Sequence, residues 1–439
     1  MAVSTHSSAR TEWREYRWVV LASFLGFSFF SLTTYAMGLF MQPLAAEFGW
    51  SRAQVTAGLS LGAFITIPLG PLVGAAVDRW GSRRIAILSL SLTCAALAAF
   101  GLANGSPTQW LALWAIFAVV SIGSKSTVWT AAVSNSFSSA RGLALGFTMS
   151  GAAASQVVTP PLTNWLIETQ GWRLAFAWLG FGWGGLALLT TVLFFRDRAD
   201  RERARLKSQP NVATPTAAVL PGLSFREALR SPAILRISLS TIITIFLGIA
   251  FLVHQVPILT EAGVSRSTAA YLASLTGLAG IAGKLLTGMM ADRWNAGLVG
   301  GITLATPAIA FVMLLEPFRS PALIVAAMII IGYSAGAKLQ VTAYLTSRYA
   351  GLRNFGKIFG IMGSLIAIAS GLGPVAAGAL YDATGDYTAL ILAGIPGSLI
   401  CGLLIIGLGP FPNWQSEASA APEEGPAGPV KSALAPNPR

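Results

Sequence analysis

Long apolar stretches separated by short polar segments follow one another along this chain. A helix needs about 20 apolar residues to cross the hydrocarbon core of a membrane, and the pattern predicts twelve such helices. Their ranges are 18–41, 53–77, 85–104, 108–133, 143–166, 174–195, 237–259, 268–290, 297–315, 321–345, 358–380 and 388–410. The first stretch runs on past any plausible cleavage site, so it is expected to be an anchor rather than a removed signal peptide. The pattern predicts an all-α integral membrane protein.

The composition excludes a soluble protein of this length. Charged residues make up 10% of the 439 residues and hydrophobic residues 54%, whereas soluble domains carry roughly 25% charge. The two cysteines, Cys94 and Cys401, both lie in apolar stretches, and the chain has no CxxC pair. No disulfide framework, metal site or cofactor is therefore expected.

The basic residues are distributed unevenly between the two sides of the predicted membrane. With the N-terminus in the cytoplasm, 22 of the 29 basic residues fall in cytoplasmic segments and four in outer loops, Arg52, Arg173, Arg266 and Arg319. This asymmetry follows the positive-inside rule and places both termini in the cytoplasm. It also accounts for most of the positive charge, so we expect a lipid bilayer and no nucleic acid as a partner.

Four segments divide the chain. Residues 1–195 and 231–412 each hold six predicted helices. Residues 196–230 form a polar, charged linker that is expected in the cytoplasm, with a short surface helix near Phe225. The tail at 413–439 is rich in Pro, Ala and Glu, and has too few apolar residues to fold.

The two six-helix halves repeat each other at an offset of 213 to 214 residues. The matching pairs are Pro43 and Pro257, Glu47 and Glu261, Gly49 and Gly263, Ser51 and Ser265, Arg52 and Arg266, Gly74 and Gly288, Asp78 and Asp292, Arg79 and Arg293, Trp80 and Trp294, Lys125 and Lys338, Gly146 and Gly360, Pro161 and Pro374, Gly171 and Gly385, and Gly180 and Gly394. Six helices followed by six helices have the same orientation, so the halves are related by an axis along the membrane normal. This architecture places a substrate site between the halves, open alternately to each side, and indicates a transporter.

Three basic residues, Lys125, Lys284 and Lys338, fall inside predicted helices, and no acidic residue falls at the centre of one. Ionisable groups inside a membrane are expensive and mark functional sites. Each lysine lies about 17 residues into a helix that runs from outside to inside, so all three share one depth. As repeat mates, Lys125 and Lys338 are expected to face each other across the central axis. A cationic layer without acidic partners predicts a site for an anionic substrate; pairing with backbone carbonyls or water is the structural alternative.

Lysine is over-represented among these buried cations. The chain has 23 Arg and six Lys, yet all three cations in the predicted helices are Lys. Lysine can lose its proton when it is buried, whereas arginine stays charged. One hypothesis is that one of these lysines takes up a proton together with the anion.

Aromatic residues near the lysines would suit the apolar body of an organic acid. Trp129 lies one helical turn after Lys125, and Tyr35 and Tyr333 lie near the expected cavity. Each of these three could instead belong to the core. The predicted helices contain no pair of carboxylates and no nucleophile–base arrangement, so the protein is not expected to be an enzyme.

The loop after the second predicted helix resembles the GxxxDRxGxRR signature of the major facilitator superfamily. The matching residues are Gly74, Asp78, Arg79, Gly81, Arg83 and Arg84, and a second copy keeps Gly288, Asp292 and Arg293. The resemblance implies the two-domain fold of that superfamily, in which this loop acts as a cytoplasmic gate. The second copy lacks the trailing pair of arginines.

The start of the fifth predicted helix is similar to a signature of the monocarboxylate transporter family, F-x-x-x-R-x-x-A-x-G-x-x-x-x-G. The matching residues are Phe137, Arg141, Ala144, Gly146 and Gly151. The stretches His254–Ser265 and Phe40–Ser51 are also similar to bacterial members of that group.

In that family a cation in the eighth helix binds the substrate carboxylate, and the resemblance assigns this role to Lys284, four residues before Gly288. An Asp one turn earlier carries the coupled proton in the family, but this chain has Gly280 there. The remaining candidates for the proton are a titrating lysine and His254, whose structural alternative is a satisfied side chain at the Pro257 kink. A third possibility is anion exchange without a proton, as in the similar oxalate:formate exchangers.

We therefore expect a monomeric, multi-pass secondary transporter in a bacterial inner membrane that moves a small organic anion, most simply a monocarboxylate, with or without a proton. The chain has no GxxxxGK[ST] motif, so an ion or solute gradient must drive it. One alternative is an exchanger for di- or tricarboxylates, because three lysines exceed what one carboxylate needs. Another is a membrane sensor that binds an anion without transporting it.

Overall fold

The computed structural model describes residues 9–137, 140–196, 222–351 and 355–412. Within these ranges the chain is helical, and pairing between extended segments is limited to one isolated bridge between Gly222 and Gly351.

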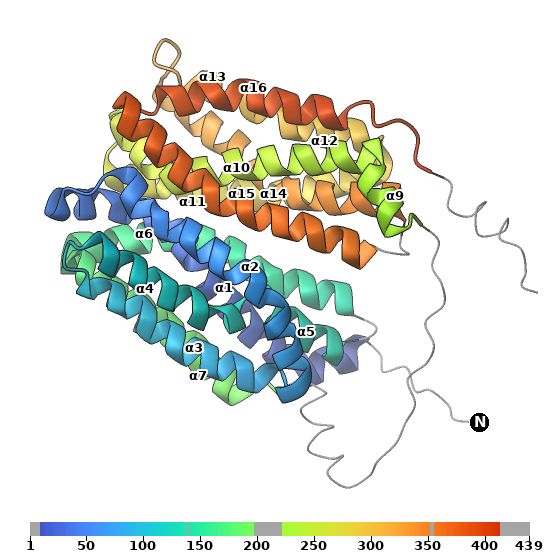
Figure 1. Cartoon of the computed structure of the whole chain (residues 1–439), viewed down its shortest axis with the longest axis horizontal. Coiled ribbons are helices and arrows are strands. Elements are labelled where there is room, and N and C mark those ends of the chain that lie inside the picture. Colours follow the sequence, from blue (N-terminus) through green and yellow to red (C-terminus); the bar gives the residue numbers. More distant parts are fainter. Residues whose placement is uncertain (1–8, 138–139, 197–221, 352–354, 413–439) are drawn as a thin grey trace, which may run out of the picture.

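The helices form two bundles side by side (Figure 1). The first bundle contains α1 (Ala9–Phe48), α2 (Arg52–Trp80), α3 (Ser82–Ala99), the short turn η1 (Phe100–Leu102), α4 (Pro107–Val120), the turn η2 (Ser121–Ser124), α5 (Ser126–Ser136), α6 (Arg141–Ala177), the π-helical η3 (Trp178–Trp183) and α7 (Gly184–Phe194). The second contains α9 (Phe225–Arg230), α10 (Pro232–Glu261), α11 (Arg266–Arg293), α12 (Ala296–Ala305), α13 (Pro307–Leu314), α14 (Pro321–Ala350), α15 (Phe355–Thr384) and α16 (Thr388–Ile405).

Ten helical stretches in the described part are long and apolar enough to cross a membrane. Two of the twelve expected spans, 143–166 and 174–195, run together in the 52-residue stretch Leu143–Phe194, and α2 is not among the ten. Gly171, with φ of 79°, interrupts that long stretch. The prediction of an all-helical protein with many membrane-spanning helices is confirmed at this level. The short helix expected near Phe225 is also present, as α9.

The repeat in the sequence recurs in the local structure of the helix junctions. Gly49 and Gly263, with φ of 68° and 84°, follow the ends of α1 and α10. Their left-handed backbone suits glycine, which has no Cβ to clash. Two residues later, Ser51 and Ser265 cap α2 and α11, and each hydroxyl accepts a hydrogen bond from the backbone three residues on. Equivalent residues therefore end one helix and start the next in both bundles.

The span expected over 108–133 is present as Pro107–Ser136, but its helix is interrupted at Lys125. It is divided into α4, the turn η2, an extended residue at Lys125 with ψ of 171°, and α5. In a continuous helix the Ser124 carbonyl would accept the N–H four residues on. Here it accepts the indole N–H of Trp129 at 2.8 Å, while the backbone N–H of Val128 turns to the Lys125 carbonyl. One side-chain hydrogen bond and one shifted backbone hydrogen bond thus replace the regular pattern at this point.

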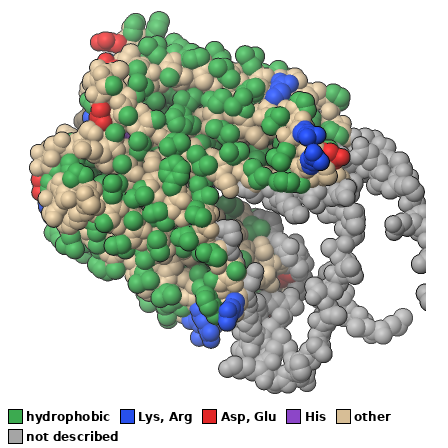
Figure 2. Space-filling model, in the orientation of Figure 1, with side chains coloured by type: hydrophobic (Ala, Val, Ile, Leu, Met, Phe, Trp, Pro, Cys, Tyr) green, Lys and Arg blue, Asp and Glu red, His purple; other side chains and the backbone are tan. Residues whose placement is uncertain are grey.

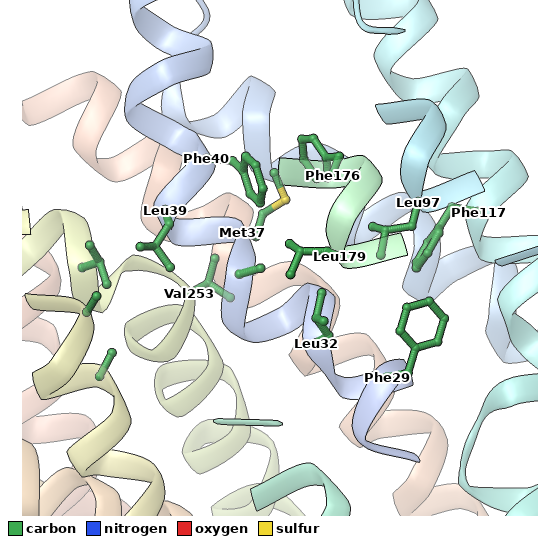
Figure 3. Packing of buried hydrophobic residues seen from close by; sticks show 14 of the residues in the cluster. Phe29, Leu32, Met37, Leu39, Phe40, Leu97, Phe117, Phe176, Leu179 and Val253 are labelled. Carbon is green, nitrogen blue, oxygen red and sulfur yellow. The ribbon is translucent and has the colours of Figure 1, made fainter. Parts of the chain in front are cut away.

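The two bundles meet along α2 and α15, α6 and α11, and α1 and α10. Figure 3 shows part of the core beside this junction, where Met37 and Leu39 of α1 lie near Val253 of α10. On the other side of α1, Phe40 stacks on Phe176 with ring centroids 3.8 Å apart. Aromatic stacking of this kind adds to the free energy gained by burial.

At one end, which we call the closed end, the bundles are joined by polar contacts. It comprises the junctions α1–α2, α10–α11 and α15–α16. The carboxylate of Asp382 accepts hydrogen bonds from the backbone N–H groups of Arg52 and Ala53, both at 3.0 Å. The Arg52 guanidinium lies 4.3 Å from the ring centre of Tyr381, and Arg266 donates to the carbonyl of Leu39 at 2.6 Å.

The opposite end, where α9 lies, is called the open end. Figure 2 shows the surface hollowed between the two bundles toward this end. The bundles therefore touch at one end and, on the face shown in Figure 2, separate toward the other.

Candidate functional site

A cavity of about 310 Å³ lies between the two bundles. It is lined from both, by α1, α2, α4 and η2 on one side and by α10 and α15 on the other. The residues are Phe30, Thr33, Thr34, Leu59, Gly62, Ala63, Thr66, Trp114, Phe117, Ala118, Ser121, Lys125, Ile249, Val253, Ala367, Ser370, Gly371 and Pro374. The lining is mostly apolar, with hydroxyl groups and a single charged side chain, Lys125. Cavities of this size and character hold small organic molecules.

Lys125 stands at the break between η2 and α5. Its backbone is extended, so it forms the N-cap of α5, without a side-chain cap hydrogen bond. The first backbone N–H groups of a helix have no partner in a preceding helical turn. The Nζ atom lies 5.8 Å from the ring centre of Phe30. No carboxylate in the described part of the chain lies within ion-pair distance of this lysine. A cation and the positive end of a helix dipole therefore occur together at one place on the cavity wall.

Trp114 lines the same cavity and carries a buried hydrogen-bond donor. Its side chain is 3% exposed, and its indole N–H is buried without a hydrogen-bond partner among the described residues. Gly58 makes room for the ring, because a Cβ at that position would lie 2.0 Å from Trp114 Cδ1. Sequence reasoning missed Trp114, since nothing distinguishes it from the other tryptophans in the apolar stretches.

Lys338 lines a different cavity. That cavity is smaller, about 40 Å³, and lies mainly within the second bundle. The two lining sets share no residue, and α10 contributes Ile249 and Val253 to the first cavity and Gly248 and Gln255 to the second. Lys125 and Lys338 thus lie on opposite sides of α10, and the expectation that they face each other is wrong in this structure.

Lys284 is exposed on α11 and lines neither of these cavities. Its neighbour Gly283 packs against the backbone of Tyr333, because a Cβ there would come within 2.0 Å of the Tyr333 carbonyl oxygen. The Tyr333 hydroxyl accepts a hydrogen bond from Thr287 at 3.0 Å. Tyr333 therefore ties α14 to α11.

The other two aromatic candidates are also outside the lining of the 310 Å³ cavity. Trp129 is fully buried, packs against Gly26 of α1 and donates to the Ser124 carbonyl. Its position supports the core alternative and gives it a role in holding the helix break at Lys125. Tyr35 is partly buried on α1.

His254 is buried, and both ring nitrogens are engaged. Nε2 lies 2.9 Å from the carbonyl oxygen of Pro374, which can only accept, so Nε2 donates. Nδ1 lies 2.7 Å from the hydroxyl of Tyr387. Burial raises the pKa of Tyr387, which stands between α15 and α16, so this hydroxyl keeps its proton and donates to Nδ1. The geometry supports the satisfied, structural alternative for His254.

The residues of the loop signature lie at the open end of the molecule, where α2 and α11 end. Gly81, with φ of 87°, separates α2 from α3, and Arg83 donates to the Val192 carbonyl at 2.5 Å. Arg79, Arg84 and Arg293 are exposed. Gly288 lies against the side chain of Gln340. The surroundings of Gly74 and the side chains of Asp78 and Asp292 lie outside the described part.

The family signature at the start of α6 mostly serves packing against α1. Phe137 is buried, with its ring centre 5.4 Å from Trp13 and 5.9 Å from Tyr16. Ala144 is buried, and a Cβ at Gly151 would lie 2.3 Å from the carbonyl oxygen of Phe24. Gly146 has open space around it. The side chain of Arg141 lies outside the described part.

Comparisons with known proteins agree with this architecture. The chain is similar to monocarboxylate transporter 12 of Xenopus laevis, with 26% identity over 303 residues. That match covers 63% of this chain and 63% of the relative, less than two thirds of its length. Monocarboxylate transporter 11 of Homo sapiens is 28% identical over 425 residues, covering 89% of this chain and 82% of the relative. An MFS-type transporter of Gibberella moniliformis is 28% identical, covering 73% and 74%.

Solved structures share the fold. An inward-facing, unoccupied bacterial homologue of the human lysosomal transporter Spinster superposes with a TM-score of 0.64 at 20% identity, covering 89% of this chain and 94% of that one. A D-xylose–proton symporter gives a TM-score of 0.66 at 15% identity, covering 90% and 98%. The sequence profile of the Major Facilitator Superfamily matches residues 21–335 and 248–438. The chain therefore belongs to the Major Facilitator Superfamily, a family of multi-pass membrane transporters rather than enzymes.

Proposed function

We propose that this protein is a secondary active transporter of a small organic monocarboxylate. The observation that carries the proposal is the cavity between the bundles, where one unpaired cation, Lys125, stands at a helix break. Discontinuous helices whose N-termini point at an anionic group are a recurrent device of secondary transporters. Similarity to the monocarboxylate transporters adds independent support.

The cavity favours a single carboxylate attached to an apolar body. Lys125 can donate to a carboxylate oxygen, and we assign the second donor to the indole N–H of Trp114, which has no partner among the described residues. Phe30, Phe117 and Ile249 offer apolar surface to the rest of the solute. Lys284 and Lys338, which a di- or tricarboxylate would need, lie outside this cavity. This arrangement favours a monocarboxylate over the di- or tricarboxylate exchange alternative.

We infer that the open end faces the cytoplasm and that the chain crosses the membrane twelve times, with both termini inside. Lys and Arg side chains gather toward the open end on the face shown in Figure 2, as the positive-inside rule requires of a cytoplasmic side. The closed end is then the outer gate of an alternating-access cycle. An inner-membrane location and action as a monomer complete this proposal.

Coupling to a proton requires a side chain that can take up and release one. Gly280 occupies the place of the acidic residue that the family uses, and a Cβ there would lie 3.3 Å from the Gly332 carbonyl, so this position serves helix packing. Lys284 has no carboxylate in the described part of the chain within ion-pair distance, whereas both nitrogens of His254 are already engaged. We therefore place proton uptake, in a symport cycle, at Lys284 ahead of His254.

The test is uptake of radiolabelled acids into proteoliposomes, with and without an imposed inward proton gradient. Lactate, pyruvate, an aromatic acid, oxalate and a dicarboxylate cover the alternatives. We expect one of the three monocarboxylates to accumulate, with uptake lost in Lys125→Met. Lys284→Met is the matched variant: it should keep gradient-independent binding of the acid and lose the response to the gradient. Uptake that requires a preloaded dicarboxylate would overturn the monocarboxylate proposal.

A further inference from the structure

The smaller cavity, which Lys338 lines, contains a buried ammonium group. Lys338 on α14 is 8% exposed, so its ammonium group is largely removed from water and from the inter-bundle cavity. A Cβ at Gly248 would lie 2.8 Å from Nζ, which places the ammonium directly against the bare backbone of α10. Removing a charge from water costs several kcal/mol unless a partner compensates it.

The protein supplies polar groups around this ammonium but no carboxylate. None of the residues lining the cavity is acidic, and no described carboxylate lies within ion-pair distance of Lys338. Ser334, Ser398 and Gln255 are among its buried polar neighbours. The hydroxyl group of Thr244, on the α10 wall of the same cavity, is buried beside the thiol of Cys401, a weak hydrogen-bond partner, and has no oxygen or nitrogen partner among the described residues. A buried hydroxyl of this kind can donate to a bound anion.

The size of the cavity limits what can compensate the charge. Its volume is about 40 Å³, against about 310 Å³ for the cavity at Lys125. On the same scale a single water needs roughly 10–15 Å³, so about three or four water-sized groups fit. An organic acid with a hydrocarbon body does not fit, whereas a single-atom anion does.

We propose that the Lys338 cavity is a binding site for a monovalent inorganic anion of halide size, such as chloride. The anion would accept from the Lys338 ammonium and the Thr244 hydroxyl, and would neutralise the charge inside the second bundle. This site is separate from the organic-anion site at Lys125, because α10 lies between the two.

The test uses purified full-length protein in detergent and follows its thermal unfolding. Chloride or bromide is titrated against sulfate at constant ionic strength, with no organic acid present. A ligand that binds only the folded protein stabilises it by RT ln(1 + [L]/Kd). We expect a saturable rise in unfolding temperature that is lost in Lys338→Met, weakened in Thr244→Val and retained in Lys125→Met.

A direct measurement of chloride binding to the wild-type protein gives a result even if the Lys338→Met variant fails to fold. Equilibrium binding of radioactive chloride to the wild-type protein should reach one ion per chain, and Thr244→Val should lower its affinity. Absence of saturable chloride binding to the wild-type protein would overturn the proposal. So would binding that disappears in Lys125→Met and persists in Lys338→Met, since the halide would then occupy the inter-bundle cavity. Neither result depends on whether an organic acid is transported.

Discussion

Asp382 offers a sharp test of how the closed end is held together. This exposed carboxylate on α15 accepts two hydrogen bonds, each 3.0 Å long, from the backbone N–H groups of Arg52 and Ala53 at the start of α2. It therefore caps a helix of the other bundle. Asp386, four residues later, accepts from the backbone N–H of Thr388 at 2.8 Å and caps α16 within its own bundle. Replacing each by alanine separates the loss of a contact between bundles from the loss of a local cap.

The expected effect of Asp382→Ala follows from these contacts. Loss of a side-chain cap costs about 0.5–2 kcal/mol, and loss of a negative charge at a helix N-terminus costs about 0.3–1 kcal/mol at an exposed site. Because Ser51 still caps α2 in the variant, we take about 1–2 kcal/mol as the combined loss. Since 1.4 kcal/mol is a factor of ten, the ratio of closed to open conformations at this end should fall about 5- to 30-fold.

The change can be followed with one reporter cysteine. Cys94 and Cys401 are buried and are first replaced by alanine. Thr33→Cys then places a thiol in the inter-bundle cavity, beyond the closed end. A membrane-impermeant maleimide added outside intact cells should label it 5- to 30-fold faster in Asp382→Ala than in Asp386→Ala. Equal labelling rates in the two variants would refute the idea that Asp382 holds the bundles together.

Three further substitutions probe the cavity wall and the buried histidine. Trp114→Phe removes one hydrogen-bond donor worth about 0.5–1.5 kcal/mol, so the KM for the transported acid should rise about 2- to 12-fold; an unchanged KM would remove Trp114 from the site. Gly58→Ala puts a methyl group 2.0 Å from the Trp114 ring, so the unfolding temperature in detergent should fall by the equivalent of about 1–3 kcal/mol. Tyr387→Phe leaves Nδ1 of His254 buried without a donor and should cost about 1–3 kcal/mol in the same assay. Tyr381→Phe is its matched control, and equal losses would contradict this account.

The helices and their junctions could largely be predicted because they depend on local chemistry. Apolar stretches of sufficient length, Gly49 and Gly263 at the helix ends, and Ser51 and Ser265 as caps are all readable in the sequence. The interruption of the fourth predicted span at Lys125 was not predicted. It depends on the Trp129 indole taking the Ser124 carbonyl, a contact that apolarity alone does not reveal.

The grouping of the candidate site residues depended on tertiary structure. One depth in the membrane suggested one layer of lysines, but depth says nothing about the direction in which a side chain points around its helix axis. Lys125 and Lys338 point into cavities on opposite sides of α10, and Lys284 lies outside both. Trp114 became a candidate because its N–H is buried without a partner.

By itself, the sequence determined that the chain is a helical membrane protein built as a tandem repeat, with three lysines that lack acidic partners. Hydrophobic length, glycine and serine placement, and the absence of internal carboxylates are properties of single stretches, so they survive without knowledge of the packing. Only the tertiary structure decided which lysine shares a cavity with both bundles, which aromatic rings belong to the core, and which end of the molecule is closed. Those properties depend on helices that are more than 100 residues apart in the chain, such as α2 and α15, and on rotations about helix axes that no local pattern specifies.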